Sequence, residues 1–77
     1  MHEPEQELIV DLRKLRCPMA FVQAKLAILS RQQGKPLVLL LSDRGTRTDV
    51  PRWLEKKQIT FNILADHKAE MSVRITG

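Results

Sequence analysis

The chain of 77 residues has little that could staple a small domain together or place it in a membrane. It has a single cysteine, so no intrachain disulfide can form. No apolar run approaches the roughly 18 residues that span a bilayer, and the N-terminus lacks the basic and apolar regions of a secretory signal. We therefore expect a protein of the reducing cytoplasm, folded as one domain over residues 1–77 after a disordered polar tail at residues 1–6.

Aromatic side chains are also scarce, at 4% of the residues, and tyrosine is missing. Phe21, Trp53 and Phe61 are spaced like core residues and are not interleaved with basic residues, as a base-stacking surface requires. The formal charge of +4 suits an acidic partner, although many soluble domains carry a similar excess charge. Direct nucleic-acid binding is therefore not expected.

The sequence lacks the residue patterns that a metal site or a Cys-His hydrolase requires. Cys17, His2 and His67 have no metal-ligand spacing, and a closed zinc site requires four ligands. A Cys-x-x-Cys redox pair is missing, and no sequence feature brings a histidine beside Cys17 for hydrolysis of the Cys-His type. We expect neither a metal ion nor an organic cofactor.

Hydrophobic periodicity predicts four strands and two helices in the order β-α-β-α-β-β. The strands alternate apolar and polar residues or, in the second strand, form a continuous apolar run, while the helices repeat apolar residues at intervals of three and four. The predicted segments are a strand at 7–12, a helix at 18–33, strands at 37–41, 59–63 and 71–76, and a second helix at 48–57.

The connections predict how these elements pack. A short polar link joins the last two strands as a hairpin, and right-handed crossovers place both helices on one face of a four-stranded mixed sheet. The expected fold is therefore an α/β two-layer sandwich, with Thr48 or Asp49 capping the second helix. The apolar stripes expected to face the sheet are Val22, Leu26 and Leu29 on the first helix and Val50, Trp53 and Leu54 on the second.

Cys17 lies directly before Pro18, where the first strand gives way to the first helix. Proline is favoured in the first turn of a helix, so Cys17 falls at or near the N-cap, where backbone N–H groups and the positive end of the helix dipole face its sulfur. Arg13, Lys14 and Arg16 add positive potential that favours a thiolate. We predict a reactive cysteine; the alternative is a buried cysteine that acts as a small hydrophobic residue.

Several motifs together resemble the TusA/SirA family of small sulfur-carrier proteins over the segment from Glu7 to Gly77. They are Asp11-Leu12-Arg13, Leu15-Arg16-Cys17-Pro18, Gly34 after the first helix, and Thr48-Asp49-Val50-Pro51. In that family a Cys-Pro-x-Pro motif opens the first helix, and its cysteine carries a persulfide sulfur. Here Ala20 replaces the second proline, and Arg13-Lys14-Leu15 replaces the usual glycine-containing turn.

The resemblance implies a sulfurtransferase that acts as a protein persulfide carrier. Cys17 would receive sulfur from a donor such as a cysteine desulfurase and pass it to an acceptor sulfur-relay protein, for example in tRNA thiolation. We expect a monomer. The residues expected to take part in partner docking are Lys25, Arg44, Arg47, Asp49 and Arg52. The alternative is a non-catalytic regulatory or interaction module on the same fold, possibly RNA-associated.

Overall fold

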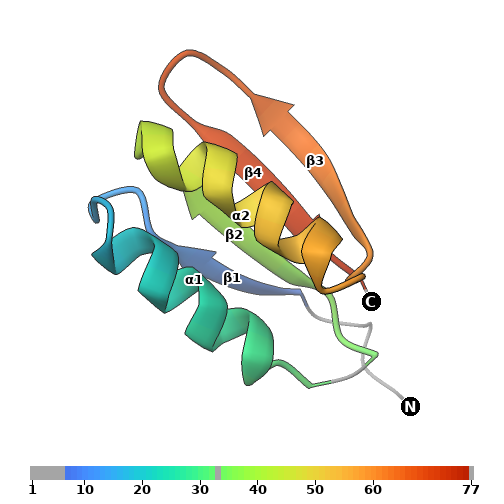
Figure 1. Ribbon diagram of the computed structural model, residues 1–77. Coiled ribbons are helices and arrows are strands. Elements are labelled where there is room, and N and C mark those ends of the chain that lie inside the picture. Colours follow the sequence, from blue (N-terminus) through green and yellow to red (C-terminus); the bar gives the residue numbers. More distant parts are fainter. Residues whose placement is uncertain (1–6, 33, 77) are drawn as a thin grey trace.

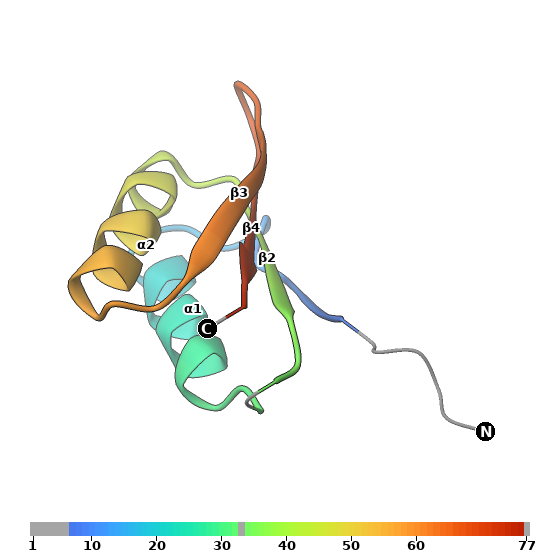
Figure 2. The same ribbon diagram turned by 90° about the vertical axis from the view of Figure 1, so that its right-hand side faces the viewer.

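A four-stranded mixed sheet with two helices on one of its faces makes up the chain in the computed structural model, which describes residues 7–32 and 34–76 (Figures 1 and 2). The predicted tail at residues 1–6 lies outside the described residues. The elements are β1 (Leu8–Asp11), α1 (Met19–Leu29), β2 (Leu37–Leu41), α2 (Arg44–Lys56), β3 (Phe61–Asp66) and β4 (Met71–Ile75). The predicted α/β sandwich and its β-α-β-α-β-β order are confirmed.

The sheet has the strand order β1-β2-β4-β3. β1 runs parallel to β2, while β4 pairs antiparallel with both β2 and β3. Leu37 of β2 is therefore flanked by Leu8 on one side and Ile75 on the other. This central position matches the continuous apolar run of β2, in which Leu37, Val38, Leu39 and Leu41 are all buried.

The core lies between the sheet and the helices. Alternate residues of the two central strands point toward the helices and are almost fully buried. Val50 and Leu54 of α2 are buried against them, as predicted, and Trp53 packs at the border of the core while half-buried. The buried residues on this face of the sheet are Leu37, Leu39, Leu41, Met71, Val73 and Ile75, and Val38 is buried as well.

The predicted core stripe of α1 was wrong. Val22, Leu26 and Leu29 are 38%, 54% and 67% exposed. The helix instead buries Ala20, Ala24 and Ile28 against the sheet and α2. At about 100° per residue, the buried residues lie on the side of the helix opposite the expected stripe. Both sides are apolar, and the side with two alanines allows α1 to approach its neighbours closely.

Both helices also have boundaries that differ from the prediction. α1 ends at Leu29, where Ser30 forms the C-cap and its hydroxyl donates a 2.7 Å hydrogen bond to the Leu26 carbonyl. Gly34, with a φ of +86°, lies in the turn beyond this end and does not stop the helix itself. α2 begins at Arg44, four residues before the predicted start at 48, because Asp43 is its N-cap.

Candidate functional site

Cys17 lies at the end of the loop that joins β1 to α1, and its side chain is exposed. Pro18 occupies the N-cap position of α1, so Cys17 directly precedes the cap, close to its predicted place. A proline side chain offers no hydrogen-bonding group to the helix, and the first N–H groups of α1 depend on other partners. The alternative of a buried structural cysteine is ruled out by the exposure of Cys17.

The start of the second helix also adjoins the thiol. A Cβ atom placed on Gly45, in the first turn of α2, would lie 3.8 Å from Cys17 Cβ and 3.9 Å from Cys17 Sγ. Any side chain at residue 45 would therefore touch the thiol. Cys17 lies beside the N-terminal ends of two helices, and both ends carry a partial positive charge.

Asp43 holds the start of α2 in place next to this cysteine. Its carboxylate accepts 2.9 Å hydrogen bonds from the backbone N–H and the hydroxyl of Thr46. These bonds, in that order, hold the pKa of Asp43 below its usual range, and the nearby backbone N–H groups of Cys17 and Gly45 lower it further. Asp43 thus connects the loop that carries the thiol to α2.

Sequence reasoning missed Asp43 because it placed the helix start at the later Thr48-Asp49 pair. The signal was present, since aspartate is a favoured N-cap residue and Asp43 follows shortly after an apolar strand. Asp49 lies within α2 and is half-buried. Thr48 directs its hydroxyl to the Arg44 carbonyl at 3.4 Å, as a residue inside a helix does.

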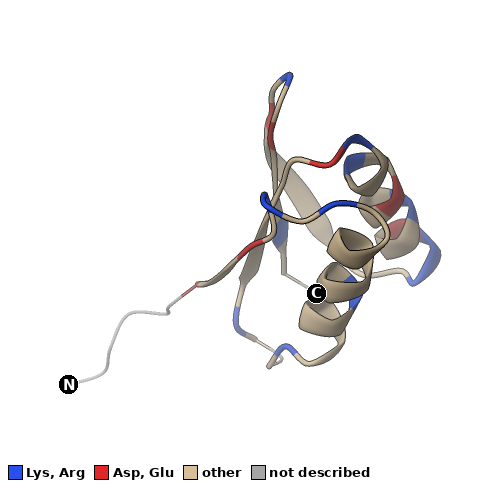
Figure 3. Cartoon of the chain, turned by 90° about the vertical axis from the view of Figure 1, so that its left-hand side faces the viewer, with Lys and Arg blue, Asp and Glu red and all other residues tan. Residues whose placement is uncertain are grey.

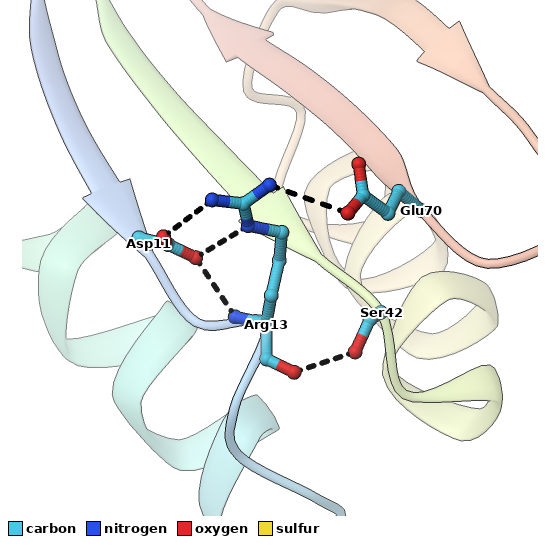
Figure 4. A network of polar contacts seen from close by, with 4 residues as sticks. All are labelled: Asp11, Arg13, Ser42 and Glu70. Atoms are coloured by element: carbon cyan, nitrogen blue, oxygen red, sulfur yellow. Dashed lines mark hydrogen bonds and ion pairs between the residues drawn. The ribbon is translucent and has the colours of Figure 1, made fainter.

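Arg13 is held in a network of polar contacts at the end of β1 (Figure 4). Its guanidinium binds both carboxylate oxygens of Asp11, at 2.9 and 2.8 Å, and Glu70 Oε2 at 3.2 Å. The hydrogen bonds from Arg13 lower the pKa of Asp11 to about 2, and those to Asp11 raise the pKa of Arg13. The Ser42 hydroxyl donates a 2.6 Å hydrogen bond to the Arg13 carbonyl.

This network ties the loop before Cys17 to the end of β2 and to the hairpin between β3 and β4. The Arg13 guanidinium forms ion pairs with Asp11 and Glu70, and these contacts hold the loop between β1 and α1 in position. Support of the thiolate by Arg13 and by the exposed Lys14 and Arg16 stays a prediction.

Ala20, which replaces the second proline of the family motif, has a defined place in the structure. Its side chain is 1% exposed, and its backbone N–H donates a 2.9 Å hydrogen bond to the Arg16 carbonyl. A proline has no N–H and could not form this bond. The substitution therefore closes the first turn of α1 onto the loop, and this N–H is used by a carbonyl rather than by the thiol.

The residues predicted for docking lie on both helices, with Lys25 on α1 and the others on α2. Figure 3 shows the Lys and Arg positions spread over helices, loops and the hairpin. Arg44 opens α2 next to Gly45, and Arg52 is exposed two turns farther along. Arg47 donates a 2.9 Å hydrogen bond to the His67 carbonyl, which ties α2 to the β3–β4 hairpin. On α1, Lys25 Nζ lies 4.6 Å from the centre of the Phe21 ring. Their role in docking stays a prediction.

A pocket of about 370 Å³ lies away from Cys17. Ser30, Arg31, Pro36 and Leu37 are among the residues that line it, at the opposite end of α1 from the thiol. Among residues 7–32 and 34–76, no group of three or more His, Cys, Asp or Glu side chains could hold a metal ion.

The fold and the site define a class: a small two-layer α/β protein with its one cysteine exposed at a helix start. The sequence model of the family described as sulfurtransferase TusA matches residues 8–77, and the chain belongs to this family. The resemblance inferred from the sequence motifs is thereby confirmed. A comparison with curated proteins gave no match. In the part of the chain that the structure describes, no helix has the length and apolar character needed to cross a membrane.

Proposed function

We propose that the chain is a persulfide carrier and that Cys17 holds the transferred sulfur. Membership of the TusA family implies a sulfur-carrier role, and the chain has one cysteine on which a sulfur could be held as a persulfide. The observation that carries the proposal is the exposed Cys17 thiol beside the N-terminal ends of α1 and α2.

The reaction is an exchange between a thiolate and a persulfide. The Cys17 thiolate attacks the terminal sulfur of a donor cysteine persulfide, forming a sulfur–sulfur bond at Sγ as the donor's own sulfur–sulfur bond breaks. The donor cysteine leaves as a thiolate with the electron pair, so there is no net oxidation. In the second half, an acceptor thiolate attacks the terminal sulfur on Cys17, and Cys17 leaves as the thiolate.

The surroundings of Cys17 suit both halves of this exchange. Because Cys17 is exposed, a cysteine presented by another protein can reach its sulfur from solvent. With no second cysteine in the chain, an intramolecular disulfide cannot trap the carrier before it meets its acceptor.

The proposed partners are a sulfur-donor protein, such as a cysteine desulfurase, and an acceptor sulfur-relay protein. We propose that the chain meets both as a monomer in the cytoplasm and serves a pathway such as tRNA thiolation. Docking through Lys25, Arg44, Arg47, Asp49 and Arg52 belongs to the same proposal.

Intact-mass spectrometry after incubation with a purified cysteine desulfurase and cysteine tests this function. The wild type should gain one sulfur atom, and mild reduction should remove it. Cys17→Ser should gain none and should unfold at the same denaturant concentration as the wild type, because serine has nearly the same volume and Cys17 is exposed. A wild type that gains no sulfur from any donor would favour the interaction module instead.

A further inference from the structure

α1 carries a row of exposed apolar side chains on its outer side. Met19, Val22, Leu26 and Leu29 are all exposed, and Met19 is 51% exposed. Their spacing of three, four and three residues places them on one narrow stripe of the helix, opposite the buried side. We call these four residues the outer α1 stripe. Contiguous exposed apolar residues of this kind are typical of interaction surfaces.

The outer α1 stripe begins at the same end of α1 as the thiol. Met19 is two residues after Cys17 and is the first residue of α1. A protein that brings a cysteine persulfide to Cys17 Sγ therefore comes to this end of α1, and the stripe continues from there along the helix. Docking on the stripe and reaction at the thiol can then occur in one encounter.

The charge around the stripe indicates what kind of surface covers it. α1 contains no acidic residue, and its one charged residue, Lys25, flanks the stripe. The exposed Arg16 lies just before the helix, and the chain as a whole carries a formal charge of +4. A second copy of the chain would bring these positive charges together, whereas a surface with carboxylates around an apolar centre would pair with them.

We propose that the outer α1 stripe is the docking surface for the sulfur-donor protein, which presents an apolar patch bordered by carboxylates. This inference rests on the proposed carrier function. The stripe supplies the apolar contact and Lys25 and Arg16 supply the charged border, an arrangement typical of protein interfaces.

The test measures binding and sulfur loading with purified cysteine desulfurase from the same organism. The variants are Leu26→Glu and Leu26→Lys, with Leu64→Glu on β3 as the control, because Leu64 is 53% exposed and Leu26 is 54% exposed. Leu26→Glu should raise both the Kd for the desulfurase and the KM for loading roughly tenfold, with kcat unchanged. Leu26→Lys should raise them less, because only glutamate adds repulsion. Leu64→Glu should stay within about twofold of the wild type.

Loading from inorganic polysulfide separates this inference from the carrier function, because a small donor needs no docking surface. Leu26→Glu should gain sulfur from polysulfide as fast as the wild type. Equal KM and Kd values for Leu26→Glu and the wild type would overturn the docking surface while the carrier function stood. If the wild type gained no sulfur from either donor, the carrier function would fail, and the Kd values alone would decide the docking surface.

Other occupants of the stripe would give different results. Sedimentation should find the wild type monomeric, and a dimer that Leu26→Glu dissociates would show that a second copy covers the stripe. Flotation with vesicles of phosphatidylcholine and phosphatidylserine should find no binding that depends on Leu26. Either contrary result, or a wild type that does not bind the desulfurase, would overturn the proposal.

Discussion

The two helices lie side by side on the same sheet, yet they differ in how clearly their sequences predict the buried side (Figure 1). α2 is polar except for a few apolar residues, so Val50 and Leu54 could only face the core. α1 has one charged residue among 11 and is apolar on opposite sides. Amphipathic spacing identifies a buried face only where the other face is polar. A surface helix that is apolar on both sides indicates a second contact beyond the fold.

The largest effect on stability should come from the buried side of either helix. Ile28→Ala in α1 and Leu54→Ala in α2 should each lower the free energy of unfolding by about 2–5 kcal/mol, because both side chains are fully buried and leave a cavity. Urea denaturation measures this directly. If Ile28→Ala were near neutral, α1 would be facing the sheet with another side.

A smaller effect on the free energy of unfolding should come from Asp43, the N-cap of α2, and this effect should depend on pH. The pKa of Asp43 is lowered in the folded protein, so its stabilisation is fully present above the ordinary carboxyl pKa of about 3.9 and is lost as the pH falls toward the lowered value. Asp43→Asn keeps a cap oxygen but does not titrate.

The difference in unfolding free energy between the wild type and Asp43→Asn should therefore shrink as the medium is acidified below about pH 4. The pair of Asp11 and Arg13 is present in both proteins, so its own pH dependence cancels in this comparison. A difference that stayed constant down to the lowest pH would mean that Asp43 does not titrate with a lowered pKa.

The smallest effect should come from the outer α1 stripe. Leu26→Ala should change the free energy of unfolding by no more than about 0.5 kcal/mol, because the side chain is more than half exposed and alanine favours helix at least as well as leucine. Thermal unfolding beside Ile28→Ala gives a matched comparison within one helix. A loss comparable to that of Ile28→Ala would place Leu26 in the core.

The sequence predicted the order of the elements, the position of β2 and the buried residues of α2, because each rests on a clear periodicity or a continuous apolar run. It could not choose the buried side of α1, where the choice depends on how closely Ala20 and Ala24 let the helix approach. The start of α2 was missed because Thr48 and Asp49 are also favoured cap residues, and only the contact between Asp43 and Thr46 shows that the helix starts earlier.

The features of the candidate site likewise fall into those that the local sequence predicts and those that depend on contacts between distant segments. The place of Cys17 next to the α1 start followed from Pro18, a local signal. Its nearness to Gly45 did not, because that contact joins residues far apart in the chain and depends on the packing of α1 against α2. The binding of Arg13 by Asp11 and Glu70 likewise depends on where the β3–β4 hairpin lies.

The central claim is that Cys17 carries sulfur and releases it again, and an isotope pulse and chase tests this most directly. The protein is loaded by a cysteine desulfurase with cysteine that contains heavy-isotope sulfur, and ordinary cysteine then follows together with a thiol acceptor. Peptide mass spectrometry should find the heavy sulfur on Cys17 during the pulse and lose it during the chase. A Cys17 that never gains the label, or that keeps it throughout the chase, would contradict the account.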